Sequence, residues 1–317
     1  MAAARTVLRY LTDVPIFLDR FPTNRHSTEY EMLVASAFSH VLNLPFFTSD
    51  DDDPHVANKV KWNGSVTGVQ KAPGGEADAV ATAYGFSITV EATRKTRANQ
   101  WTDEFSQAIR HAKWFANSHG LRMNQVVSVL VCPSIYSDTY NAIRHRGDEA
   151  PIVIPMENQV LVDVLRTSIL AQTMLHAEIR DLLDDVCEQF ENLTVRRYCE
   201  SVRAITKKWQ AHVLKSEQMA FVGARAYRAL TKMRNDTGRS SFSDGEILRC
   251  LERHTTVMQY YRILGADDVS VRDIDQALRD HKLAFSRGKT FDGEILFCPV
   301  CKDDFAGRLQ RLMREVG

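Results

Sequence analysis

Hydrophobic residues in the first half of the chain alternate between helical spacing and short strand-like runs. Between residues 27 and 44, apolar side chains recur every three or four positions after cap-forming hydroxyls, which predicts a helix. Residues 77–83 and 86–90 have strand composition, and Tyr84 and Gly85 between them are typical of a tight turn. The pattern therefore predicts a helix followed by a β-hairpin.

The same alternation continues as far as residue 170. Residues 102–118 have helical spacing, with Thr102 as the expected cap. Residues 126–131 are a continuous apolar run rich in β-branched side chains, as in a buried central strand. A strand over 151–156 and a helix over 157–170 complete the order. We expect an α/β fold in which one mixed sheet is flanked by helices.

Beyond Thr167 the pattern changes to long helical stretches with almost no Gly or Pro until Gly223. We therefore predict two domains, an α/β domain over 1–175 and a mainly helical domain over 176–317. In the second domain, short helices, a helix over about 270–281 and a terminal hairpin resemble a winged helix.

Composition and charge narrow the function only slightly. The 317 residues are enough to bury a sizeable core. Lys plus Arg equals Asp plus Glu at 40 each, which gives no support to nucleic-acid binding but leaves room for a local basic face. The sequence has no long apolar run and no signal-peptide pattern, so we expect a soluble cytoplasmic protein without a membrane partner.

The six cysteines are sparse for this length, and we expect reduced thiols. Cys298 and Cys301 have the spacing of half a zinc site, which normally needs a second pair of ligands. The sequence shows no second Cys pair. Cys250, His254 and His281 could complete such a site only if the fold brought them together.

Two acidic residues fall where the predicted hairpin could hold a metal ion. Asp78 is expected on the first strand and Glu91 at the end of the second, so adjacent strands would fix both carboxylates. The backbone carbonyl of Ala92 could supply a third oxygen. Phosphodiester hydrolysis uses a divalent cation held by oxygen ligands, and Mg²⁺ is the expected cofactor.

Three features surround these carboxylates: Glu76-Ala77-Asp78, Ile88-Thr89-Val90-Glu91-Ala92-Thr93, and the spacing to Glu104 and His111. In these features the segment resembles the AlwI-type restriction endonucleases, relatives of the FokI cleavage domain in the PD-(D/E)XK nuclease superfamily. The resemblance covers about residues 27–170. It implies the restriction-endonuclease fold, with Asp78 and Glu91 as metal ligands. It also implies Glu104 and His111 as further catalytic residues near the metal or its water.

One position departs from the general pattern of that superfamily. Thr93 stands where the general pattern has lysine, as it does in the AlwI-type group. Lys95 or Arg97 could replace the lysine by binding the scissile phosphate, or His111 could orient or deprotonate the water. If they have no role in the site, Lys95 and Gln100 are expected to be exposed loop residues.

Other candidate residues have structural alternatives. Glu31 occupies the place of the acidic residue that often leads the first helix of this nuclease class, and Glu29 is the competing candidate. Glu104 could instead favour the positive end of its helix. His111 could be a partly buried structural histidine.

These patterns favour a metal-dependent, site-specific DNA endonuclease of type II, either an IIS-like restriction enzyme or a nicking enzyme. The resemblance implies 5′-phosphate ends. One site cuts one strand, so double-strand cleavage would need a homodimer, a second nuclease subunit or sequential nicks. The alternatives are a non-catalytic DNA-binding or assembly subunit with a nuclease fold and a defence nuclease acting on other nucleic acids.

The second domain would then recognise double-stranded DNA or mediate assembly. The polar face of the helix over 270–281 could read base edges, although any exposed helix has such a face. The basic stretch over 196–215 is a better candidate for phosphate contact than for sequence reading.

Overall fold

The computed structural model describes most of the chain, which divides into two compact units, 1–211 and 212–317. The described residues are 2–48, 58–64, 72–83, 86–145, 150–171, 176–190, 194–264, 269–281, 283–290 and 294–299.

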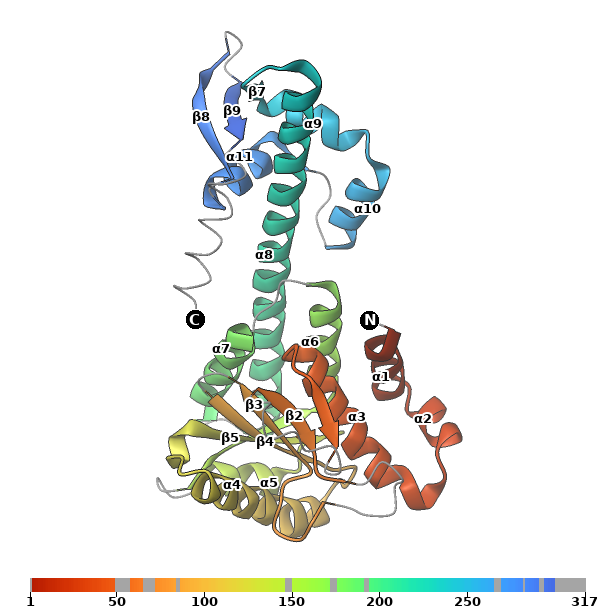
Figure 1. Cartoon of the computed structure of the whole chain (residues 1–317). Coiled ribbons are helices and arrows are strands. Elements are labelled where there is room, and N and C mark those ends of the chain that lie inside the picture. Colours follow the sequence, from red (N-terminus) through yellow and green to blue (C-terminus); the bar gives the residue numbers. More distant parts are fainter. Residues whose placement is uncertain are drawn as a thin grey trace. The chain divides into compact units, whose positions relative to one another are not determined.

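A six-stranded mixed sheet forms the centre of the first unit (Figure 1). Its strands are β1 (Phe46–Thr48), β2 (Lys59–Trp62), β3 (Ala79–Ala83), β4 (Phe86–Ala92), β5 (Val126–Cys132) and β6 (Ile152–Glu157). They lie side by side in sequence order. β3 is antiparallel to both of its neighbours, whereas the other neighbouring strands run parallel to each other. Among the described strands of this sheet, β3 therefore runs opposite to the rest.

Helices cover both faces of this sheet. α3 (His26–Val41) and α6 (Asn158–Leu170) pack on one face, and α1 (Ala2–Thr12) packs against both of them. α4 (Ser106–Ser118) packs on the other face, where Ala112 and Phe115 belong to one apolar cluster with Val80 and Val126. The other helices of this unit are α2 (Val14–Arg20), α5 (Ser137–Arg144), α7 (His176–Cys187) and the first part of α8 (Val195–Thr237).

The predicted α/β fold with one mixed sheet flanked by helices is confirmed. The helix expected over 27–44 is α3, and the expected hairpin is the antiparallel pair of β3 and β4. The turn predicted at Tyr84 and Gly85 lies outside the described residues. The sequence pattern did not predict α1 or β1. α1 buries a narrow face that includes Val7 and Leu11, so its helical state depends on α3 and α6.

The second unit combines short helices with a small sheet. Its apolar core joins the second part of α8 to the elements that follow it and includes Leu230, Phe242, Ile274 and Phe297. Gly223 in α8 allows close approach by the end of α11, since a Cβ there would lie 3.2 Å from the His281 side chain. These elements are β7 (Phe242–Ser243), α9 (Asp244–Glu252), α10 (Thr255–Ile263), α11 (Val271–Asp280), β8 (Ala284–Lys289) and β9 (Ile295–Pro299).

The predicted helix over 270–281 and the terminal hairpin correspond to α11 and the β8–β9 pair. A third strand, β7, adds to β9 and gives the sheet order β7-β9-β8. β7 has only two residues, too few to give a strand pattern. The winged-helix assignment of this unit stays a prediction.

The two compact units meet within α8, a helix of 43 residues, whereas the sequence pattern predicted a domain boundary at 175/176. α7 and the beginning of α8 pack with the first unit because their apolar side chains lie against its sheet. The Tyr198 hydroxyl, for example, donates a hydrogen bond to the Pro155 carbonyl over 3.0 Å.

The described cysteines, which include Cys132, Cys199 and Cys298, are all free thiols. Cys298 lies on β9, and Cys301 is outside the described residues. The interpretation of this pair as half a zinc site stays untested.

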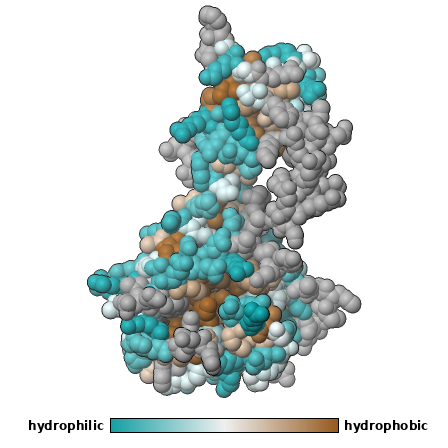
Figure 2. Space-filling view, turned by 90° about the vertical axis from the view of Figure 1, so that its left-hand side faces the viewer, coloured by the Kyte–Doolittle hydropathy of each residue, from teal (hydrophilic) through white to brown (hydrophobic). Residues whose placement is uncertain are grey.

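The surface in Figure 2 is mainly hydrophilic, with hydrophobic residues gathered in limited areas. Only a few large hydrophobic side chains are exposed among the described residues, and Ile263, at 60%, is the most exposed of them. None of the described helices is both long enough and apolar enough to cross a membrane.

Candidate functional site

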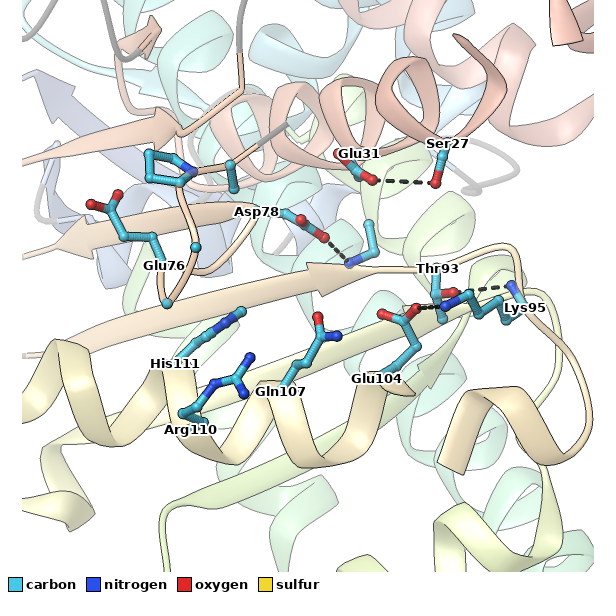
Figure 3. Close-up of a pocket in the computed structure, with 15 residues that line it drawn as sticks. Ser27, Glu31, Glu76, Asp78, Thr93, Lys95, Glu104, Gln107, Arg110 and His111 are labelled. Atoms are coloured by element: carbon cyan, nitrogen blue, oxygen red, sulfur yellow. Dashed lines mark hydrogen bonds and ion pairs between the residues drawn. The ribbon is translucent and has the colours of Figure 1, made fainter. Parts of the chain in front are cut away.

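A cavity of about 330 Å³ lies in the first unit between α3 and α4, at the end of β4 (Figure 3). Polar and charged side chains from both helices and from the β4 end project into it. The residues that the sequence analysis singled out and that line the cavity are Glu31, Asp78, Ala92, Thr93, Lys95, Glu104 and His111.

Strand pairing brings Asp78 and Glu91 together. Ala79 of β3 pairs with Val90 of β4, so the next step of the same register places Asp78 opposite Glu91. The sequence pattern placed Asp78 on the first strand of the hairpin. In the structure, Asp78 lies one residue before β3. Its carboxylate accepts a hydrogen bond from the Ala92 amide over 2.8 Å. The β3–β4 pair thus fixes the two carboxyls opposite each other. Asp78 lines the cavity, whereas Glu91 lies buried behind it and is not among the lining residues.

Burial and mutual repulsion disfavour charge on this carboxyl pair. Glu91 is 2% exposed. Burial raises the pKa of Asp78 well above its usual value, and the neighbouring Glu91 and Glu31 carboxyls raise it further. Burial also raises the pKa of Glu91 well above the usual range, with Glu104 and Glu31 adding to the effect. A bound cation would offset this repulsion and favour the ionised carboxylates.

His111 contacts Glu91 directly from α4. Its Nδ1 lies 2.7 Å from Glu91 Oε1, and both side chains are buried. Burial lowers the pKa of His111, and the nearby Arg110 lowers it further. A neutral imidazole whose Nδ1–H donates to the Glu91 carboxylate fits this geometry. His111 therefore holds the Glu91 carboxyl in one orientation.

The sequence pattern placed Thr102 at the N-cap of the α4 helix, and this assignment is wrong. A π-helical turn, η3 (Gln100–Phe105), precedes α4, and Thr102 lies inside it. The wider turn carries Glu104 to the cavity, where its carboxylate lies 2.8 Å from Lys95 Nζ. Glu104 thus has a partner in the site and is not only a charge near a helix end.

Lys95 is held by two acidic residues, because its Nζ also lies 3.0 Å from Asp103. Burial lowers the pKa of Lys95, but its hydrogen bonds to Glu104 and Asp103 outweigh burial and raise the pKa. The Lys95 backbone amide donates to Thr93 Oγ1 over 3.0 Å. Thr93 therefore takes part in the turn that presents Lys95 to the cavity.

Gln100 was expected to be an exposed loop residue, and the structure contradicts this expectation. It is fully buried, and its amide group donates hydrogen bonds to the carbonyls of Lys95 and Ser134 and accepts one from the Tyr136 amide. A buried amide needs such partners. Gln100 fixes the Lys95 backbone, a role that sequence spacing did not indicate.

Glu31 lines the cavity, whereas Glu29 does not. The Ser27 hydroxyl donates a hydrogen bond to Glu31 over 3.3 Å. Glu29 instead forms an ion pair with Arg25 one turn earlier on the chain. Arg97 is exposed, has a positive φ of 77° and is not among the residues that line the cavity. Lys95 lines the cavity and Arg97 does not, so Lys95 is the candidate for the role of the lysine that Thr93 replaces.

The donor set of the cavity fits a hard divalent cation. Asp78, Glu91 and the Ala92 backbone carbonyl offer only oxygen ligands, and Mg²⁺ commonly binds one or two carboxylates while keeping several waters. Within the described ranges, no group of three or more His, Cys, Asp or Glu side chains is arranged to hold a metal ion. Two carboxylates and one backbone oxygen are compatible with that finding.

The sequence analysis did not assign roles to Gln107 and Arg110, although both line the cavity. Glu104, Gln107 and His111 are three and four residues apart, which places them along one face of a helix. That spacing was a signal in the sequence, but it could not show which face of α4 met the carboxyl pair.

No family model matches the chain, and no curated protein matches its sequence. Among solved structures, the chain is similar to the small subunit (R.BspD6I2) of the heterodimeric restriction endonuclease R.BspD6I. The two chains are 16% identical, with a TM-score of 0.46, and the similarity covers 64% of this chain and 98% of that subunit.

Proposed function

We propose that this protein is a metal-dependent endonuclease that hydrolyses phosphodiester bonds in the cavity between α3 and α4. The observation that carries the proposal is the pair of Asp78, directly before β3, and Glu91 of β4, which the strand register sets opposite each other. Their repulsion disfavours the two charges in the absence of a cation. Lys95, which lines the same cavity as Asp78, adds a positive charge that suits a phosphate substrate.

The carboxylates of Asp78 and Glu91 and the Ala92 carbonyl would hold Mg²⁺. A bound Mg²⁺ would lower the pKa of the attacking water and offset charge on the phosphate oxygens. The amide of Ala92 orients Asp78, and the imidazole of His111 orients Glu91. Such supporting contacts fix ligand geometry and raise the affinity of a metal site.

Lys95 takes the role of the lysine that Thr93 replaces in the general pattern. Glu104 and Asp103 hold its ammonium group at the cavity wall, and Gln100 holds its backbone. From that position the ammonium would bind a non-bridging oxygen of the scissile phosphate. A fixed positive charge there stabilises the additional negative charge that develops in the transition state.

The test is incubation of the purified chain with mixed plasmid and phage DNA and Mg²⁺. Asp78→Asn and Glu91→Gln should each lower the cleavage rate by roughly 10³-fold, because each removes a ligand charge from the metal site. Asp138→Asn is the matched control, since Asp138 is an exposed carboxylate on α5 outside the cavity. Cleavage that persists in both site variants would overturn the assignment.

More narrowly, we propose a restriction-type endonuclease of the AlwI group that acts on double-stranded DNA, on the motif resemblance described above. The geometry of this chain shows one candidate site among the described residues. Double-strand cleavage would then use a homodimer, a second nuclease subunit or sequential nicks. A wild-type chain that binds DNA but does not cut it with Mg²⁺ would favour the non-catalytic subunit.

The second unit is proposed to read the DNA sequence through α11. Ile274, Ala277 and Leu278 anchor this helix in the core, which leaves Arg272 and Gln276 exposed one turn apart on its outer face. Arg and Gln are suited to hydrogen bonds with purine edges in the major groove.

A further inference from the structure

Two polar side chains in the cavity have no role in the mechanism above. Gln107 and Arg110 both line it from α4 and are three residues apart. In Figure 3 they project from α4 on the same side as Glu104 and His111. Neither has a hydrogen-bond or ion-pair partner among the residues that the structure describes. Arg110 is exposed, and Gln107 is half-buried.

Arg110 and Lys95 differ in whether an acidic side chain binds their positive charge. Lys95 is engaged by Glu104 and Asp103, whereas Arg110 keeps all its donors for a ligand. Arg110 is nevertheless near enough to the carboxyl pair to lower the pKa of Glu91. Its guanidinium therefore lies beside the metal site without being neutralised by it.

An anionic ligand explains this arrangement better than a neutral one. A nucleic-acid strand entering the cavity must approach the four carboxyl groups that line it, those of Glu31, Glu76, Asp78 and Glu104. The metal and Lys95 can serve the scissile phosphate, but the next phosphate along the strand needs its own positive partner. A guanidinium presents paired N–H donors that match phosphate oxygens, and an amide adds a neutral donor.

We propose that Arg110, with Gln107 beside it, forms a binding subsite for the DNA phosphate adjacent to the scissile phosphodiester. The proposal deepens the proposed function and rests on it. Arg110 and Gln107 are binding and positioning residues here, because they hold the strand and do not contact the reacting atoms.

The experiment measures binding of a fluorescent DNA duplex by the full-length chain in Ca²⁺, across a salt series, beside cleavage in Mg²⁺. Arg110→Ala should weaken binding by about tenfold and reduce the slope of log affinity against log salt by about 0.9, since one phosphate contact is lost. Arg110→Lys should keep the slope and lose part of the affinity. Gln107→Ala should weaken binding less and leave the slope unchanged.

Lys113→Ala is the control, since Lys113 is an exposed cation on the same helix that does not line the cavity. Thermal unfolding of every variant excludes misfolding. If Arg110→Ala binds DNA with the wild-type affinity and slope while the wild type cuts DNA, the subsite is wrong and the nuclease stands. If the wild type neither binds nor cuts DNA, both proposals fail. An equal loss in Lys113→Ala would also overturn the subsite, because the effect would then be general to the helix surface.

Discussion

The surroundings of Asp78 and Glu91 favour the neutral form of each carboxyl group over the charged form. Burial raises both pKa values, and the neighbouring Glu31 adds to each. Burial lowers the pKa of His111, whose Nδ1 lies 2.7 Å from Glu91 Oε1. Without a metal ion, the carboxyl groups of Asp78 and Glu91 therefore bind protons more tightly, and a bound cation would release those protons.

The raised pKa values predict a pH dependence of stability. The folded, metal-free chain binds protons at Asp78 and Glu91 more tightly than the unfolded chain does. The contribution of these groups to stability is thus complete below about pH 4, near the ordinary carboxyl pKa, and is lost as pH rises through the raised values. Asp78→Asn removes one such group, so the variant should gain stability relative to the wild type as pH rises from 4 to about 8.

Urea unfolding in EDTA across that pH range measures the difference between the two proteins. Asp138→Asn, at an exposed carboxylate, should show no comparable trend. A constant difference between Asp78→Asn and the wild type would contradict the prediction.

At the scale of elements, β4 and β5 form the rigid base of the site. Their parallel pairing sets Glu91 beside Leu130 and Ala92 beside Val131. α4 packs over both strands and carries His111 to Glu91. Register and helix packing together, and not either one alone, place the imidazole beside the carboxyl.

The same strand pair contains two buried hydroxyls that have no hydrogen-bond partner among the described residues. They belong to Thr89 and Ser128, which are paired in the β4–β5 register. Thr89→Val replaces the hydroxyl by a methyl group of similar shape, so it should stabilise the protein by about 1 kcal/mol. Thr82→Val is the matched control on β3, because the Thr82 hydroxyl donates to the Lys59 carbonyl and its loss should bring no gain. Urea unfolding decides between these outcomes, and a destabilised Thr89→Val would show that the hydroxyl is satisfied in solution.

At the scale of the whole molecule, the carboxyl pair and the α11 helix lie in different compact units. Under the proposed function, cleavage and the choice of DNA sequence would be changed by separate substitutions, since neither set of residues contributes to the core of the other unit. The boundary between the units lies within α8 and not at the predicted position 175/176.

Arg272→Ala and Gln276→Ala in α11 should therefore change where the protein cuts and not whether it needs Mg²⁺. Each should weaken preference at one base pair by about 1–3 kcal/mol, the usual value of a good side-chain contact with a base. Sequencing the ends of fragments from mixed DNA measures the preference. An unchanged cut-site consensus in both variants would remove α11 from the proposed recognition surface. Arg279→Ala serves as the comparison, since Arg279 already pairs with Asp275 on the same helix.

Hydrophobic periodicity in the sequence by itself determined the order of the main helices and strands, because burial of an apolar stripe or run is a local property of each segment. It therefore predicted α3, the β3–β4 pair, β5 and β6. The spacing of Asp78, Glu91, Glu104 and His111 was also visible in the sequence.

Only the tertiary structure decided which of these side chains meet and through which atoms. The π-helical turn brought Glu104 to Lys95, and packing buried Gln100 and selected Glu31 over Glu29 for the cavity. Such contacts join residues distant in sequence, and their geometry depends on strand register and helix rotation, which local spacing does not specify. For the same reason, only the packing of α4 over the sheet shows that Arg110 lines the cavity.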